Sequence, residues 1–211
     1  MITEIEARVL GSLVEKQLTT PEYYPLTLNS LTAASNQKSN RDPVMSLGES
    51  EVLEAIDSLR DKNLVYLFHG STSRTVKYKH MLPSVYEVDE AGTAVITLLL
   101  LRGPQTAGEI RGRSDRLHEF GSIGEVQETL DELASRDEPL VTKFERQPGQ
   151  KEPRYAHLLS GPVDPGVQLS HASPSASHGS AASGLEEDVR ELREELNKLR
   201  EEFDKFRSEF G

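Results

Sequence analysis

Cysteine is absent from this 211-residue chain, and so is tryptophan. Without cysteine the protein can form neither disulfides nor thiolate metal sites, and a reducing compartment is consistent with this composition. The six histidines are scattered along the sequence. His80 and His157 occupy equivalent positions in two similar segments, where a repeated packing or hydrogen-bonding role explains them better than metal ligation. We therefore expect no metal site.

Long apolar runs are also missing. The longest lies between Ala94 and Leu101, far short of the ~20 residues needed to cross a bilayer. The first residues, Met1 to Glu6, contain neither a basic leader nor the long apolar stretch of a secretory signal. These absences predict a cytoplasmic protein with no membrane partner.

Basic residues are too few to balance the acids, and the net charge is −11. The charge is −1 over residues 1–83, −5 over residues 84–163 and −5 over residues 164–211. Non-specific affinity for nucleic acid comes mainly from neutralising phosphates. The charge therefore argues against a tight, indiscriminate DNA-binding protein.

Catalytic motifs are absent as well. The sequence contains no glycine-rich phosphate loop, no G-x-S-x-G elbow and no His-Glu-x-x-His metal helix. Glu51, Glu54 and Asp57 would share one face of a helix, but such a row lacks the converging ligands that a hard cation requires. It fits a solvated helix face better, so we expect no enzyme, no catalytic residue and no cofactor.

What the sequence does contain is an internal repeat. Residues 51–59 (EVLEAIDSL) reappear as residues 125–133 (EVQETLDEL), with the acids and most apolar positions kept. Each copy is followed by an apolar strand (Leu64 to Phe68; Leu140 to Phe144), a loop and a second strand. Each full repeat has roughly 75 to 80 residues, near the lower limit for a domain with its own core, so the copies are expected to pack together.

Capping patterns divide each repeat into three helices. In the first, Thr3-x-x-Glu6 starts one helix, a short helix covers Thr27 to Ala34, and Ser46-x-x-Glu49 starts the third. A polar loop that ends at Pro43 separates the second and third helices. Two strands joined by residues 69–74 complete the repeat.

The second repeat has the same order. Its first helix, Asp89 to Leu101, ends at Gly103-Pro104, and Thr106-x-x-Glu109 and Ser122-x-x-Glu125 cap the next two. Three helices and a two-stranded ribbon are the order of a winged helix, a helix-turn-helix variant. We therefore predict a mainly α protein with small β-hairpins (α+β), with tandem winged-helix domains at residues 1–83 and 84–160.

The remaining residues predict a linker and a coiled coil. Residues 161–184 are rich in Ser, Ala, Gly and Pro, which is typical of a flexible linker. Residues 185–211 carry a heptad seam of apolar residues at alternating spacings of four and three. Charges at the flanking positions favour parallel self-association, as a dimer or a trimer, over the alternative of one helix folded back on its own domains. The predicted oligomerisation residues are Leu185, Val189, Leu192, Leu196, Leu199, Phe203, Phe206 and Phe210.

Any contact with DNA is expected away from the third helices. In a helix-turn-helix fold the third helix normally enters the major groove, but here it is acidic in both repeats and would be repelled by phosphates. Basic residues on the loops and wings are better candidates for phosphate contacts, although ordinary solvated charge is the better explanation for any single one of them. These candidates are Lys38, Arg41, Arg74, Lys77, Lys79, and the local cluster Arg111, Arg113 and Arg116.

Several long motifs in residues 1–160 closely resemble the YceH-like family of bacterial proteins. They include EKQLTTPEYYPL at residues 15–26, NQKSNRDPVM at residues 36–45 and LLRGPQT at residues 100–106. The resemblance implies a tandem winged-helix fold in a bacterial cytoplasm, and it implies no activity. The loop from Asn36 to Pro43 is a candidate for a shared functional surface, or a structural loop whose side chains cap helix ends.

Two functions remain open from the sequence. The first is a non-catalytic regulator that binds DNA through its wings and Arg-bearing loops as a coiled-coil oligomer. The second is a protein-protein adaptor without DNA binding, whose acidic third helices dock a basic partner or pack between domains. The fold favours the first and the charge distribution favours the second.

Overall fold

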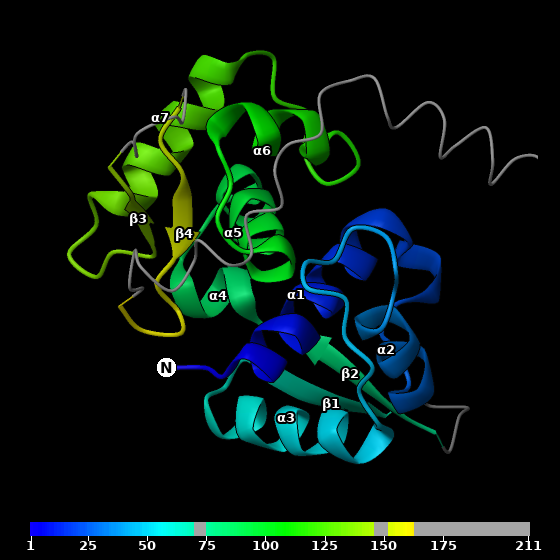
Figure 1. The fold of residues 1–211 in the computed structure, drawn as a ribbon. Helices are drawn as coiled ribbons and strands as arrows, with labels where there is room; N and C mark the ends of the chain where they lie inside the picture. Colours follow the sequence, from blue (N-terminus) through cyan, green and yellow to red (C-terminus); the bar gives the residue numbers. More distant parts are fainter. Residues whose placement is uncertain (70–74, 146–151, 163–211) are drawn as a thin grey trace, which may run out of the picture. The chain divides into compact units, whose positions relative to one another are not determined.

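The computed structural model describes residues 1–69, 75–145 and 152–162 (Figure 1). Within these residues the protein is mainly helical, with seven α-helices, one short 3₁₀ helix and two antiparallel two-stranded sheets. The order of three helices and a hairpin occurs twice. The duplication predicted from sequence is therefore present in the order of the elements.

The first repeat follows the predicted order of elements. Its first helix begins where predicted, because the Thr3 hydroxyl accepts the Glu6 N–H and the Glu6 carboxylate accepts the Thr3 N–H. Thr27 caps the second helix in a similar way. The elements are α1 (Glu4–Thr19), η1 (Pro21–Tyr23), α2 (Leu28–Ser35), α3 (Glu49–Asp61), β1 (Val65–His69) and β2 (Val76–His80).

The second repeat is preceded by a short helix that the sequence patterns did not indicate, α4 (Leu82–Tyr86). Asp89 then caps the first long helix of this repeat, which ends at Gly103. The φ angle of Gly103 is +67°, a left-handed value that glycine adopts without steric cost. The remaining elements are α5 (Glu90–Arg102), α6 (Ala107–Ser114), α7 (Ile123–Ala134), β3 (Val141–Lys143) and β4 (Tyr155–His157).

Two predicted caps differ in detail. The third helix of the first repeat is capped at Gly48, whose N–H donates to the Glu51 carboxylate, so the predicted box at Ser46 is wrong. Ser122 does accept the Glu125 N–H, but the Glu125 carboxylate accepts from Gly121 and so does not close the box. In both cases a carboxylate still occupies the positive end of the helix.

Each hairpin also pairs with the loop that follows the first helix of its repeat. Leu26 and Tyr78 exchange two backbone hydrogen bonds, with N···O distances of 3.3 and 2.7 Å. Gln105 and Tyr155 form the equivalent pair in the second repeat, at 3.0 and 2.8 Å. Because this extra pairing is made by β2, strand β1 pairs on only one side within the described residues.

The two repeats meet through their first helices, α1 and α5, which lie side by side (Figure 1). Both helices are buried around most of their circumference, since each packs on its own repeat and on the other one. The two helices pack closely at Gly11 of α1, where a Cβ atom would lie 2.9 Å from the Leu101 side chain and 3.1 Å from that of Leu100. The expected packing between the copies is therefore present.

The most apolar helix, α5, has 13 residues. No helix in the described part of the chain has the length and apolar character that a membrane span requires.

A side chain at Gly11 tests the contact between α1 and α5. We expect Gly11→Val to lower the free energy of unfolding by about 2 kcal/mol or more, because the added methyls overpack a closed core. Urea unfolding followed by circular dichroism measures this change. Gly112→Val is the matched control, since Gly112 is also helical but a Cβ there meets nothing within 4 Å. Equal unfolding midpoints for the two variants would contradict the packing described here.

Candidate functional site

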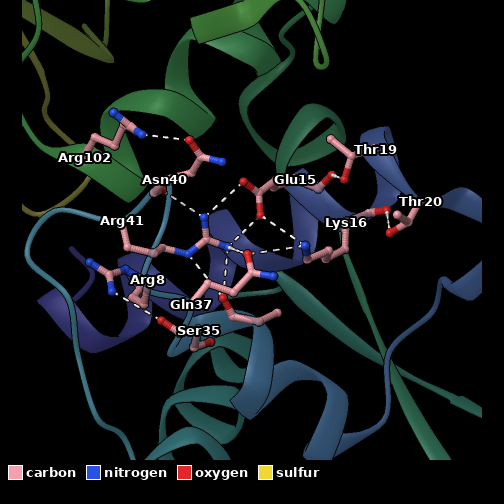
Figure 2. A network of polar contacts seen from close by, with 11 residues as sticks. Arg8, Glu15, Lys16, Thr19, Thr20, Ser35, Gln37, Asn40, Arg41 and Arg102 are labelled. Atoms are coloured by element: carbon pink, nitrogen blue, oxygen red, sulfur yellow. Dashed lines mark hydrogen bonds and ion pairs between the residues drawn. The ribbon is translucent and has the colours of Figure 1, made fainter. Parts of the chain in front are cut away.

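The polar loop between α2 and α3 is organised around Arg41, whose residue is 5% exposed (Figure 2). Its guanidinium makes a bidentate ion pair with Glu15 of α1, with N···O distances of 2.6 and 3.0 Å. It also donates to the backbone carbonyls of Ala34 and Asn40. All of its nitrogens are therefore occupied by the protein itself. This corrects the predicted role of Arg41 as a phosphate contact.

A second buried arginine, Arg8 of α1, supports the same region (Figure 2). Its guanidinium donates to the carbonyls of Ser35, at 3.3 Å, and Pro43. Burial lowers the pKa of Arg8, and the nearby Arg41 charge adds to this effect. Arg8 and Arg41 thus bind the carbonyls at the carboxyl end of α2, where a helix carries partial negative charge.

The two asparagines of the loop also make structural contacts. The Asn36 side chain donates to the Leu47 carbonyl and accepts from the Leu47 N–H, at 2.8 and 2.7 Å. Asn40 has a φ angle of +59°, which asparagine tolerates better than most residues, and its side-chain oxygen accepts from Arg102 of α5 at 2.7 Å. These contacts support the structural alternative for residues 36–43. Lys38 stays exposed on this loop.

The predicted arginine cluster of the second repeat is placed differently from the expectation. Arg111 and Arg113 lie within α6, and only Arg116 follows it. Arg113 donates to the Gln105 side chain at 2.7 Å and lies 3.6 Å from Glu109, while Arg111 lies 3.5 Å from Asp115. Arg116 is exposed. Neighbouring carboxylates therefore partly neutralise the charge of this cluster, and the Gln105 amide occupies one donor of Arg113.

The other two described candidates, Lys77 and Lys79, lie on β2 of the first hairpin. Lys77 pairs across the strands with Phe68, and Lys79 pairs with Tyr66. Alternate residues of a strand share one face, so these four side chains occupy the same face of the hairpin. Tyr66 is 50% exposed and Phe68 is 44% exposed. We call these four residues the aromatic-lysine face.

The opposite face of the first hairpin packs on the core through Val65, Tyr78 and His80, which are buried. Leu67 lies on the same face and is 37% exposed. A hollow beside this hairpin, at the carboxyl end of α3, is lined by Arg60, Asp61, Val65, Tyr66, Leu67 and His69. The hairpin therefore offers solvent one face that is aromatic and basic.

The charge around the aromatic-lysine face differs from that of the whole chain. No acidic residue occurs in the sequence between Asp61 and Glu87, although the net charge of the protein is −11. The second hairpin keeps only part of such a face. Thr142 lies opposite Ala156, Tyr155 is only 2% exposed beneath Lys143, and Arg154, beside Phe144, forms an ion pair with Glu109 at 3.0 Å. Sequence reasoning found the two lysines and missed the aromatics, although pairing YLF with KYK in antiparallel register would have revealed them.

The third helices keep their acids in solvent, as expected for solvated faces. Glu51, Glu54 and Asp57 are exposed on α3, and only Asp57 has an ion pair there, with Arg60 at 2.8 Å. Four acids are exposed on α7, namely Glu125, Glu128, Asp131 and Glu132. The close contact between the repeats is formed by α1 and α5. The acids of α3 and α7 therefore take no part in that contact.

Two equivalent histidines lie in the sheets. His80 is buried, and its backbone N–H donates to the Tyr24 hydroxyl at 2.7 Å. Burial lowers the pKa of His80 to about 4, with a smaller effect of Lys79, and burial alone lowers that of His157 to about 4. Both imidazoles are therefore neutral at pH 7, in agreement with the packing role expected from the sequence.

Arg74 and the oligomerisation residues from Leu185 to Phe210 lie outside the described residues. Within the residues that the structure does describe, no group of three or more histidines or acids could hold a metal ion.

The fold thus defines a class of mainly helical proteins with a duplicated set of three helices and a small hairpin. A family model described as "Protein of unknown function, DUF480" matches residues 2–150, and the chain belongs to this family. It is 48% identical to a UPF0502 protein of Opitutus terrae over 190 residues, which cover 90% of this chain and 82% of the relative. It is 50% identical to a UPF0502 protein of Geobacter sulfurreducens over 177 residues, covering 84% and 80% of the two chains. The resemblance to an uncharacterised bacterial family is confirmed.

Removing the guanidinium of Arg41 tests its structural role. We expect Arg41→Gln to lower the free energy of unfolding by about 3 kcal/mol or more, because it leaves Glu15 buried without its partner. Urea unfolding provides the measurement. Arg60→Gln breaks an exposed ion pair and should cost less than about 1 kcal/mol. A similar small loss for both variants would refute the structural assignment of Arg41.

Acid should destabilise the protein through His80. Its folded pKa of about 4 lies below its unfolded value of ~6.5, so stability is full above pH 6.5 and falls as the pH drops toward 4. One such histidine lowers the free energy of unfolding by about 2 kcal/mol between pH 7 and pH 5. Urea unfolding at both pH values should therefore give a smaller pH-dependent loss for His80→Gln than for the wild type. His69→Gln, which removes an exposed histidine, should keep the wild-type loss, and an unchanged loss in His80→Gln would contradict the argument.

Proposed function

We propose that this chain is a non-catalytic, nucleic-acid-associated protein of the bacterial cytoplasm, built from two tandem winged helices. In each repeat three helices are followed by a hairpin, and the hairpin pairs with the loop after the first helix. This order and pairing support the winged-helix assignment. In this proposal the first hairpin is the wing that contacts nucleic acid.

The observation that carries the proposal is the aromatic-lysine face. Lys77 and Lys79 lie beside two half-exposed aromatic rings, on a hairpin whose sequence contains no acid. Lysines supply phosphate contacts, and exposed aromatic rings supply stacking surfaces. Arg111 and Arg116 are secondary candidates, because α6 and its end leave them partly or fully exposed.

The third helices have a different role in this proposal. Their exposed carboxylates repel phosphates, so neither helix is suited to the major groove. They instead restrict nucleic acid to the wing. The heptads of the tail add a parallel coiled coil, which would join two wings and raise weak affinity through effective concentration.

A second candidate function is that of an adaptor, favoured by the acidic faces themselves. The exposed acids of α3 surround a 40% exposed Leu53, and those of α7 follow an exposed Ile123. Acids around an apolar side chain suit a basic protein partner. This reading requires no contact between the wing and nucleic acid.

A salt series separates the two functions. We expect the full-length protein to bind random-sequence DNA or RNA at about 50 mM salt and to lose most of this binding near physiological salt, because phosphate contacts release counterions. Lys77→Gln/Lys79→Gln should weaken binding about tenfold or more. Arg136→Gln/Lys143→Gln, which removes the same charge from the second repeat, should bind like the wild type.

The adaptor function gives the opposite pattern. No nucleic acid would bind even at low salt, and a polylysine peptide would bind the wild type but not Glu51→Gln/Glu54→Gln/Asp57→Asn. Binding lost equally in both lysine and control variants would also contradict the proposed wing, since it would reflect net charge alone.

A further inference from the structure

We propose that the aromatic-lysine face binds single-stranded nucleic acid in preference to duplex, with bases stacked on Tyr66 and Phe68 and phosphates held by Lys77 and Lys79. This inference rests on the proposed association with nucleic acid and specifies its form. It assigns to the first hairpin a site in which the aromatic rings, rather than the lysines alone, determine the ligand.

The spacing of the rings fits an extended strand. Tyr66 and Phe68 are two residues apart on one strand, so their Cα atoms lie about 6.5 to 7 Å apart along it. Bases within a duplex strand follow one another at about 3.4 Å and cover each other's faces. Side-chain rings at twice that spacing can stack only on bases that have separated, as they do in an unpaired strand.

Each ring has its own cation. Lys79 is the cross-strand neighbour of Tyr66, and Lys77 is that of Phe68. Directly opposed residues have Cβ atoms about 5 Å apart, within the length of a lysine side chain. A nucleotide whose base stacks on a ring therefore places its phosphate within reach of the adjoining lysine. The two aromatic-lysine pairs repeat this arrangement along the hairpin.

Within the described residues, neither ring is covered by another element. Val65 and Tyr78 already fill the core side of the hairpin, and Tyr66 and Phe68 make no ring contact with another aromatic residue in the described part of the chain. No hydrogen bond or ion pair holds Lys77 or Lys79 there either. Both the apolar and the charged half of the face are thus available to a ligand.

Other occupants fit this face less well. A peptide strand added to the open edge of β1 would use backbone groups and would need no lysine beside each ring. An acidic peptide would satisfy the lysines but would leave the rings without flat stacking partners. Asp61 lines the hollow next to Tyr66, but the strands of the hairpin themselves carry no acid. Charge and ring geometry together favour a nucleic acid strand.

The duplication adds an internal comparison. The second hairpin presents Thr142 and Ala156 in place of Tyr66 and Lys79. Phe144 and Arg154 take the places of Phe68 and Lys77, but Arg154 is already bound by Glu109 and by the Pro104 carbonyl. The arrangement of two rings, each beside an unpaired lysine, therefore belongs to the first repeat among the described residues.

The test uses the full-length protein, a labelled oligo-dT of about 12 nucleotides and a duplex of the same length, with binding followed by fluorescence anisotropy at about 50 mM salt. We expect the single strand to bind at least about tenfold more tightly than the duplex. Tyr66→Ala/Phe68→Ala should weaken single-strand binding by about 30-fold or more and duplex binding much less. Tyr66→Phe/Phe68→Tyr should bind like the wild type, because both rings are kept.

Two further variants separate stacking from charge and from general surface effects. Lys77→Gln/Lys79→Gln should reduce the slope of log affinity against log salt by about 1.4 for the single strand. Tyr23→Ala is the matched control, since Tyr23 is 71% exposed but belongs to η1 and not to the aromatic-lysine face, and it should leave binding unchanged. Circular dichroism melting of each variant checks that the fold is retained.

The outcomes distinguish the inference from the function on which it rests. Duplex binding that equals single-strand binding and survives Tyr66→Ala/Phe68→Ala would overturn the single-strand site but leave nucleic-acid association intact. Binding of neither oligonucleotide would overturn both. Competition by polyglutamate at the same charge concentration as oligo-dT would also overturn the inference, because it would show a site for charge without stacking.

Discussion

The close contact between α1 and α5 is the constraint on which the rest of the structure depends. Each repeat is small for a unit with its own core, and burying the first helix of one repeat against that of the other enlarges the shared apolar interior. Gly11 permits this approach because any side chain there would occupy the space of Leu101. The contact uses the first helices and so leaves the third helices and the first hairpin to carry surface chemistry. A function located on those elements is compatible with the packing.

The same contact explains why Arg41 is buried within a conspicuous polar loop, although Lys38, Ser39, Asn40 and Asp42 of that loop are exposed. Residues 36–43 connect α2 to α3 across the region where the repeats meet, and the Asp42 N–H donates to the Leu101 carbonyl at 2.9 Å. Buried polar groups need partners, and Arg41 with Glu15 and Asn36 with Leu47 supply them. A motif rich in Asn, Ser and Arg can thus be specified by structure alone. Its residues are therefore weak evidence for a ligand site.

The sequence allowed the elements to be predicted because their signals are local. Thr3 with Glu6, and Thr106 with Glu109, form capping boxes within four residues, and the repeat itself gave the order of helices and strands. The burial of Arg41 was not predictable in this way, since its partner Glu15 lies 26 residues earlier and on another element. The aromatic-lysine face needed one further step, the register of β1 against β2. Helix caps can be predicted from residues close in sequence. Whether a charged side chain is buried depends on which distant residue the fold places beside it.

The uneven charge gives the proposed function a physical basis. A strongly negative protein repels nucleic acid at long range, so any binding must come from a small region where cations outnumber acids. Among the described residues the first hairpin meets this requirement, because its strands carry Lys77 and Lys79 without an acid. The charge available there is small, so phosphate contacts alone would give weak binding that salt removes. Exposed rings beside the lysines supply the uncharged part of the affinity, and such stacking is available only where bases are unpaired. The low positive charge of this surface and its aromatic character thus lead to the same ligand, a single strand.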